Sequence, residues 1–160
     1  MKMHLAPQNA EIAAVLYNDQ PPDRDPTIRD GHTKGIMLAN SKSGIWMPHS
    51  IPHFPIPGPK FGYPPGGLEN GQMLLCMSLS VELLDKVLGG SLQYTKATFY
   101  NSSIPKGLQE RLATVGNVIK GKVPTGNIHY ASFELPMKEF KFDVLVKGPK
   151  FHRGKRRSAI

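Results

Sequence analysis

The sequence predicts an α+β fold in which helices flank a mixed β-sheet. Short apolar runs bounded by turn residues fill the first half of the chain, and this pattern is typical of strands. Two segments in the second half carry apolar residues at helical spacing and end at glycines. Strands mixed with two modest helices are typical of a layered α+β domain, and 160 residues allow one such domain.

The first predicted strand spans 12–17, where a continuous apolar run stops abruptly at a polar, proline-rich segment. A short helix is the alternative for this run, but the abrupt stop favours a buried strand. A loop over 20–31 leads to a hairpin over about 34–48, whose apolar runs flank turn residues over 40–44. Residues 51–67 are rich in proline and glycine, so we expect a long irregular excursion there.

The second half begins with a predicted buried strand over 72–78. Ser80 is expected to cap a helix over 81–88, which the two following glycines would end. A second helix is expected over 107–115, where apolar residues at helical spacing precede another glycine. Further short strands are expected near 91–99, 117–120, 128–135 and 139–146.

The net charge of +8 is unevenly distributed along the chain. Six Lys or Arg side chains and no acidic residue lie in 147–160. A basic end of this kind is usually a solvated tail, and DNA binding is the less frequent alternative. We therefore divide the chain into a folded domain over 10–146 and a basic, disordered tail over 147–160.

The cysteine and histidine content predicts neither a disulfide nor a metal site. Cys76 is the only cysteine, and its apolar neighbours predict a buried thiol. His49 and His53 are four residues apart, but Pro52 and Pro55 oppose the helix that a His-x3-His zinc site needs. We therefore expect no metal and no other cofactor.

Targeting signals are few. The first nine residues lack the continuous apolar segment of a signal peptide, and no apolar run approaches the length needed to span a membrane. As written, the chain is expected to remain in the cytosol and to have no membrane partner. Asn101-Ser102-Ser103 is a glycosylation sequon, which matters only in a secreted chain.

The most informative motif is His32-Thr33-Lys34, because a histidine and a lysine two residues apart on a strand point to the same side. The predicted hairpin pairs its strands about the early part of the turn, so His49 would face this motif at the open end. His32, Lys34 and His49 would then form one patch, which suits binding and attacking a phosphodiester. Two ordinary half-buried histidines on a hairpin are the plainer alternative, and geometry alone favours it.

Four collinear segments around this motif extend it into a family pattern: 16–22, 31–35, 44–55 and 71–78. Through these segments the chain resembles the deoxyribonuclease II family, acid endonucleases of the phospholipase D superfamily. The resemblance implies that the domain over 10–146 is one half of a phospholipase D-like pseudo-dimeric fold.

The resemblance implies hydrolysis of DNA at acidic pH without a metal, leaving 3′-phosphates. In the superfamily two His-x-Lys motifs from two similar halves meet. One histidine attacks phosphorus to form a phosphohistidine, and the other protonates the leaving oxygen. The lysines hold the non-bridging oxygens as negative charge builds in the transition state. Imidazole, with a pKa of about 6.5, suits an acidic compartment, and the family implies a lysosomal or secreted location.

The resemblance also assigns catalytic residues. His32 and Lys34 match the first His-x-Lys motif, and His49 matches a further histidine important in the family. Asn40 stands where the family usually carries an aspartate at the end of the strand, so a charge that could orient neighbouring groups is missing. No second His-x-Lys follows Lys34 in this chain.

Three functions remain open at this point. The first is a nuclease acting on DNA, whose site is completed by a missing C-terminal half or by homodimerisation. The second is a catalytically inactive DNA-binding remnant that uses Lys34 and the basic tail. The third is a fragment that does not fold stably, because half of a pseudo-dimeric sheet would expose an apolar interface and unpaired edges.

Overall fold

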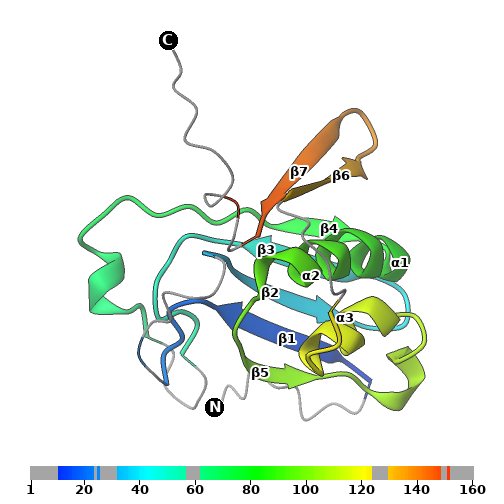
Figure 1. Ribbon diagram of the computed structural model, residues 1–160, viewed down its shortest axis with the longest axis horizontal. Coiled ribbons are helices and arrows are strands. Elements are labelled where there is room, and N and C mark those ends of the chain that lie inside the picture. Colours follow the sequence, from blue (N-terminus) through cyan, green and yellow to red (C-terminus); the bar gives the residue numbers. More distant parts are fainter. Residues whose placement is uncertain are drawn as a thin grey trace.

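The computed structural model confirms the α+β class of the chain. A five-stranded sheet, a helical layer and a two-stranded hairpin make up its elements (Figure 1). No helix in the part of the chain that the structure describes is long and apolar enough to cross a membrane. The tail predicted over 147–160 lies outside the described residues except for its positions 147, 148 and 151. The described residues are 11–23, 25, 32–56, 62–123, 130–148 and 151.

The larger sheet contains both the predicted first strand and the predicted hairpin, which are confirmed. Its strand order is β4-β3-β2-β1-β5. Ala39 pairs with Gly44 beside the turn, and the register continues to Gly35 opposite Pro48 at the open end of the hairpin. The strands are β1 (Ala13–Asn18), β2 (Lys34–Ala39), β3 (Gly44–Pro48), β4 (Met77–Leu79) and β5 (Phe99–Ser103).

All four pairs of neighbouring strands in this sheet are antiparallel, whereas we expected a mixed sheet. The reason is the connection between β4 and β5. These two strands run in the same direction, but the helical segment between them carries the chain from one edge of the sheet to the other (Figure 1). A parallel pair would need such a crossover to join strands that become neighbours.

A helical run follows β4 and extends beyond its predicted end. It consists of α1 (Val81–Leu83), the π-helical segment η2 (Leu84–Gly89) and α2 (Gly90–Thr95). Ser80 caps the run as predicted, since its hydroxyl oxygen accepts a hydrogen bond of 3.2 Å from the backbone N–H of Leu83. Such a cap satisfies one of the N–H groups that a helix start leaves without a partner.

Gly89 and Gly90 lie inside this run, so the predicted helix end was wrong, and most of the strand expected over 91–99 is helical. A Cβ on Gly90 would lie 2.5 Å from the Phe133 ring, and one on Gly89 would lie 3.0 Å from Thr114. Both glycines therefore permit close packing of neighbouring elements. Local sequence patterns do not contain that tertiary requirement.

The second predicted helix forms in two short pieces. The 3-10 turn η3 (Lys106–Leu108) and the helix α3 (Ala113–Ile119) replace the helix expected over 107–115. The strand expected over 117–120 is largely the end of α3, so that prediction was wrong. A short apolar run fits both a buried strand and a buried helix segment, so the sequence pattern does not distinguish the two here.

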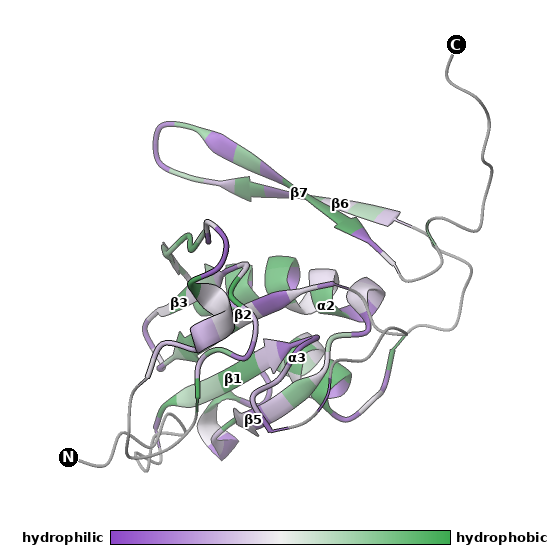
Figure 2. Ribbon diagram, turned by 90° about the vertical axis from the view of Figure 1, so that its left-hand side faces the viewer, coloured by the Kyte–Doolittle hydropathy of each residue, from purple (hydrophilic) through white to green (hydrophobic). Residues whose placement is uncertain are grey.

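The last two strands are confirmed and form a separate hairpin. They are β6 (Tyr130–Pro136) and β7 (Lys141–Lys147), which pair along their whole length. The hairpin lies next to α2 and projects from the body of the molecule (Figure 2). Leu135 and Val146 are buried on the side that faces the helices.

The helices cover one face of the five-stranded sheet and enclose the main core (Figure 1). Val15, Met37 and Trp46 point to this face from adjacent strands. Trp46 donates its indole N–H to the buried hydroxyl of Tyr17 over 2.9 Å. The helical residues of this core include Val81, Leu84, Val87, Leu88, Leu92 and Val115.

The opposite face of the sheet carries a much smaller apolar cluster. Leu16 and Ile36 supply the strand side of it, and Ile51 and Phe54 cover them from the irregular segment after β3. That segment, expected over 51–67, is irregular in its described part except for the turn η1 (Pro65–Gly67). The candidate functional residues lie beside this smaller cluster.

Cys76 is exposed, so the prediction of a buried thiol was wrong. The buried strand expected over 72–78 is reduced to the start of β4, and Met73, Leu74 and Leu75 are exposed as well. This segment runs beside Pro48–Ser50 at the outer edge of the sheet. An apolar run predicts burial only where another element covers it, and β4 is the edge strand.

Candidate active site

Three neighbouring strands bring polar residues together at one end of the sheet. Lys34 begins β2, Asn18 ends β1 directly opposite it, and His49 follows β3. The backbone N–H of His49 donates to the carbonyl oxygen of Lys34 over 3.1 Å. Since side chains alternate between the faces of a sheet, Lys34 and His49 share the face that carries Leu16 and Ile36.

Asp19 joins the two residues of the His-x-Lys motif. Lys34 Nζ donates a hydrogen bond to Asp19 Oδ1, and His32 Nδ1 lies 2.7 Å from Asp19 Oδ2. The side chains of Lys34 and Asp19 are only 2% and 7% exposed, whereas that of His32 is 82% exposed. A carboxylate only accepts hydrogen bonds, so His32 carries a proton on Nδ1. In neutral His32, Nε2 therefore holds the lone pair on a ring that solvent can reach.

His49 is a buried and neutral histidine beside this ion pair. Burial, and secondarily the charge of Lys34, lowers its pKa to about 4. Its Nδ1 accepts a hydrogen bond of 3.2 Å from the backbone N–H of Ile51, so its proton lies on Nε2. That buried Nε2 has no hydrogen-bond partner among the described residues. An unsatisfied buried donor costs about 1–3 kcal/mol and often marks a functional position.

Asn18 fixes the segment that covers the site. Its side-chain amide donates to the carbonyl oxygens of Ile51 and Phe54 over 3.2 and 3.0 Å. Its carbonyl oxygen accepts from the backbone N–H of Gln20 over 2.8 Å. Since the Ile51 N–H in turn sets the His49 tautomer, fully buried Asn18 couples the end of β1 to the position of His49.

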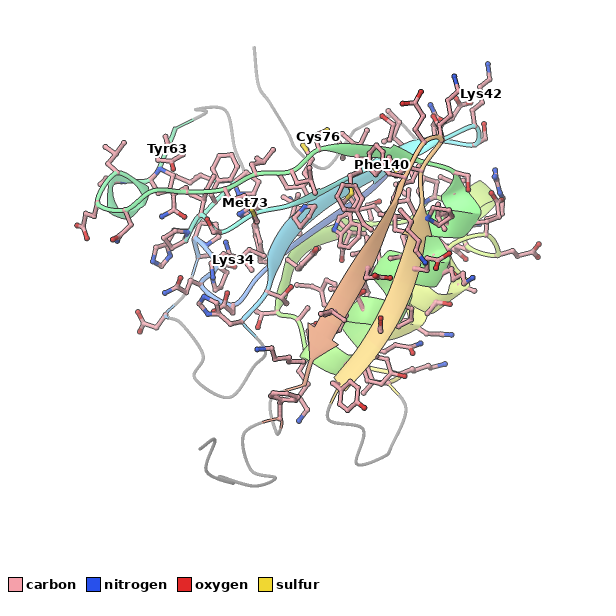
Figure 3. All side chains as sticks on the ribbon, turned by 90° about the horizontal axis from the view of Figure 1, so that it is seen from above. Lys34, Lys42, Tyr63, Met73, Cys76 and Phe140 are labelled. Atoms are coloured by element: carbon pink, nitrogen blue, oxygen red, sulfur yellow. The ribbon has the colours of Figure 1, made fainter. Side chains whose placement is uncertain are left out.

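Asn40 lies apart from the other predicted site residues. It follows the far end of β2, where its side-chain oxygen accepts from the backbone N–H groups of Lys42 and Ser43 over 2.8 and 3.1 Å. Figure 3 shows Lys42 and Lys34 at opposite ends of the hairpin. The structure thus brings His32, Lys34 and His49 to one end and gives Asn40 the role of a turn residue.

Asp19 and Asn18 are the functional candidates that the sequence analysis did not single out. Their signal was a polar pair directly after an all-apolar strand, next to a second strand that begins with lysine. The pairing of these two strands, which the sequence did not predict, places Asp19 beside Lys34.

The arrangement combines an exposed imidazole, a buried ammonium and a neutral N–H donor. An exposed imidazole with a fixed proton can attack an electrophile through Nε2. The buried ammonium beside it can stabilise developing negative charge, because Coulomb interactions are stronger away from water. Within the described ranges, no group of three or more His, Cys, Asp or Glu side chains is arranged to hold a metal ion.

Comparison with known proteins identifies relatives of one kind. A family model described as Deoxyribonuclease II matches residues 2–152. Plancitoxin-1 of Acanthaster planci is 34% identical over 124 residues, which are 76% of this chain and 33% of that protein. Deoxyribonuclease-2-alpha of Mus musculus is 36% identical over 120 residues, 71% of this chain and 33% of that protein.

A nematode relative shows a similar identity over a similar share of the chain. Deoxyribonuclease-2 of Caenorhabditis elegans is 32% identical over 123 residues, which are 76% of this chain and 32% of that protein. In each of these three cases, the matched part of the chain spans about a third of the relative's length.

Proposed function

The chain belongs to the deoxyribonuclease II family, and from this premise we propose that it hydrolyses DNA phosphodiesters at acidic pH without a metal, with His32 as the nucleophile. The observation that supports this proposal is the Asp19 carboxylate between Lys34 and His32. It fixes the proton of the exposed imidazole and holds a cation directly beside it.

The proposed reaction has two steps. In the first, His32 Nε2 attacks phosphorus, a nitrogen–phosphorus bond forms and the bond from phosphorus to the 5′ oxygen breaks. An acid must protonate that leaving oxygen. In the second, water attacks the phosphohistidine and gives a proton to the group that acted as the acid in the first step. The nitrogen–phosphorus bond breaks, His32 is released, and the 3′ side of the DNA keeps the phosphate.

Lys34 and Asp19 support the first step without entering it. The Lys34 ammonium is buried beside His32, where it stabilises the charge that builds on the non-bridging oxygens. Asp19 keeps that ammonium in place and orients the His32 ring. Both are positioning and electrostatic roles.

His49 is poorly suited to be the proton donor for the leaving oxygen. Its pKa of about 4 lies below the pH of about 5 proposed for the reaction, so its neutral form predominates there. We therefore assign His49 a positioning role and propose that a second site half provides the acid. It would come from a missing C-terminal half or from a second copy of this chain.

Since the proposed reaction needs acid, we also propose a lysosomal or secreted location for the chain. Glycosylation at the sequon that begins at Asn101 would support this location. Tagged full-length chain found only at neutral pH in the cytosol would contradict it.

Nicking of supercoiled plasmid tests the proposed activity. The 160-residue chain, alone if a second copy completes its site or with an added C-terminal half if a longer product does, should nick plasmid at about pH 5 in the presence of a chelator. His32→Ala should abolish this nicking. Lys42→Ala is the matched control, since Lys42 is an exposed turn residue at the opposite end of the hairpin. Cleavage that the chelator stops, or that survives His32→Ala, would contradict the proposal.

The second half of the site could come from a second copy of this chain or from a longer product. The two alternatives predict a different dependence of specific activity on protein concentration. If a second copy completes the site, sedimentation should detect a dimer, and specific activity should fall on dilution as the dimer dissociates. Activity of a chain that stays monomeric would exclude the second copy. The longer-product alternative predicts no nicking by this chain alone and nicking after a C-terminal half is added.

A DNA-binding remnant is the second candidate, and the uneven charge of the chain favours it. Five Lys or Arg side chains lie beyond residue 148. Deleting 149–160 should then weaken DNA binding and reduce its salt dependence, because each phosphate contact contributes about 0.7–0.9 to the slope of log K against log salt. If the deletion left this slope unchanged, the tail would not contact DNA phosphates.

A further inference from the structure

We infer that residues 73–76, which we call the apolar edge, form the surface on which a second copy of this chain docks beside the candidate site. This inference rests on the proposed function, in which a second site half provides the acid. It selects the second copy as that half and assigns the contact to named residues.

The apolar edge is held against the segment that carries His49. His49 and Leu74 form an antiparallel bridge. The hydroxyl oxygen of Ser50 accepts from the Met73 N–H over 2.8 Å, and the Ser50 N–H donates to the Met73 carbonyl oxygen over 2.9 Å. Opposed residues of such a bridge share a face, so Leu74 lies on the face of the sheet that carries Lys34. Figure 3 shows Met73 and Lys34 toward the same end of the molecule.

The side chains of the apolar edge are exposed although its backbone is fixed. Met73, Leu74 and Leu75 are 64%, 46% and 38% exposed, and Cys76 is exposed as well. Successive residues of an extended segment point to opposite faces, so the exposure extends to both sides of the apolar edge. Contiguous exposed apolar surface of this kind marks an interaction site.

More exposed apolar side chains surround the apolar edge in the sequence. Six of the twelve large apolar side chains that are exposed in the described part of the chain lie between β3 and β4. Three of these six belong to the apolar edge, and the other three are Ile56, Tyr63 and Leu68. The exposed apolar residues are therefore concentrated in the connection that follows His49.

The charge of the chain favours a second copy as the occupant. At a net charge of +8, two copies repel each other over most of their surface. Between Glu69 and Glu82 the sequence contains no Asp, Glu, Lys, Arg, His or Pro. Contact through this neutral stretch brings no like charges directly together. Edge strands that resist self-association usually carry charged residues or proline, and the edge strand β4 has neither.

A symmetric contact at the apolar edge would gather two sites around one interface. In a twofold dimer the same patch contributes on both copies. Because the apolar edge adjoins His49, each copy would bring its own His32 and Lys34 toward that contact. The second copy is then in a position to supply the acid for the leaving oxygen.

Sedimentation tests this contact on the full chain. Sedimentation equilibrium from about 1 to 100 μM should detect a monomer–dimer equilibrium. Leu74→Lys should raise the dissociation constant at least about tenfold, because a twofold contact would bury two unpaired ammonium groups. Leu145→Lys is the matched control, since Leu145 is 75% exposed on β7 of the separate hairpin, and it should leave the constant unchanged. Thermal melting of both variants would exclude unfolding as the cause of lost dimer.

Cys76 provides a second readout, because it is the only cysteine of the chain and is exposed in the apolar edge. A short bismaleimide, which joins two accessible thiols, should convert the parental chain to a covalent dimer. Leu74→Lys should prevent this cross-link. In the double variant Cys76→Ser with Leu145→Cys, the thiol lies on the hairpin, and cross-linking should be lost.

The outcomes separate this inference from the proposed function. A dimer that Leu74→Lys dissociates supports the inference even if the parental chain cleaves nothing, and His32→Ala should leave that dimer intact. Nicking by a chain that stays monomeric overturns the inference alone.

Three further results would also overturn the inference. One is a chain that stays monomeric over the whole concentration range, including a chain whose apolar edge binds only an added C-terminal half. Another is a dimer that Leu74→Lys leaves unchanged. The third is a dimer that Leu145→Lys dissociates as strongly as Leu74→Lys.

Discussion

The two ends of the β2–β3 hairpin contain similar residues in very different surroundings. At the turn end, Asn40 and Lys42 are exposed, and the Asn40 side chain bonds to the backbone of its own turn. At the open end, Asn18 and Lys34 are buried and bond across strands and loops.

The turn end is stabilised largely by local hydrogen bonds, whereas the open end buries charged groups that contact distant parts of the chain. The side-chain hydrogen bonds of Asn40 stabilise a chain reversal and are made within three residues along the chain. The open end buries an ammonium, a carboxylate and an imidazole, and such burial costs free energy. A fold tolerates that cost where the buried groups position chemistry, and this is the role that we propose for them beside the exposed imidazole of His32.

Removal of the His32 side chain should have the largest effect on nicking. We expect His32→Ala to reduce nicking by about 10³-fold or more, since loss of a nucleophile removes the covalent step. Its unfolding free energy should change by less than about 0.5 kcal/mol, because the side chain is almost entirely in solvent. Plasmid nicking and urea denaturation measure the two effects. A large loss of stability would contradict a purely chemical role.

The next largest effect should come from Asp19. Asp19→Asn leaves the Lys34 ammonium buried without its carboxylate, which should lower the free energy of unfolding by about 3 kcal/mol. The matched double variant, Asp19→Asn with Lys34→Met, removes both charges and should recover much of that stability. It should not recover nicking. A double variant as unstable as the single one would show that the ion pair is not the source of the loss.

His49 provides a pH-dependent test at the same end. In the folded chain its pKa is lowered to about 4, so between this value and about 6.5 the unfolded chain binds the additional proton. Stability from this group is therefore complete above about pH 6.5 and falls as the pH drops toward 4, by about 1–3 kcal/mol. Urea denaturation at several pH values should show a smaller fall in His49→Gln. An equal fall in both proteins would contradict the assignment.

The smallest effects should lie at the turn end. Asn40→Ala should cost about 0.5–1.5 kcal/mol, the usual net contribution of a hydrogen bond, and Lys42→Met should change stability by less than about 0.5 kcal/mol. Neither variant should alter nicking once the folded fraction is taken into account. A specific loss of nicking in Asn40→Ala would show that the two ends are coupled.

The sequence predicted what depends on local pattern. Apolar runs and turn residues located β1, the β2–β3 hairpin and the β6–β7 hairpin, and the predicted hairpin placed His49 near the His32-Thr33-Lys34 motif. Ser80 was recognised as a helix cap because its hydrogen bond is made within three residues.

The sequence did not predict what depends on contacts between distant elements. Asp19 comes beside Lys34 only when β1 and β2 pair, and Gly90 lies inside the helical run where the Phe133 ring packs closely against it. Cys76 is exposed because it lies at a sheet edge, although its neighbours are apolar. For Asp19 and Gly90, the contacting residue lies more than ten positions away along the chain.

The most direct test of the central claim is to trap the covalent intermediate on His32. The chain would be mixed with DNA at about pH 5 in chelator, quenched into alkali, in which phosphohistidine survives, and analysed by peptide mass spectrometry. We predict a nucleotide adduct on His32 that is absent in His32→Ala and present in Lys42→Met. An adduct on His49, or DNA cleavage without any adduct on His32, would contradict the claim.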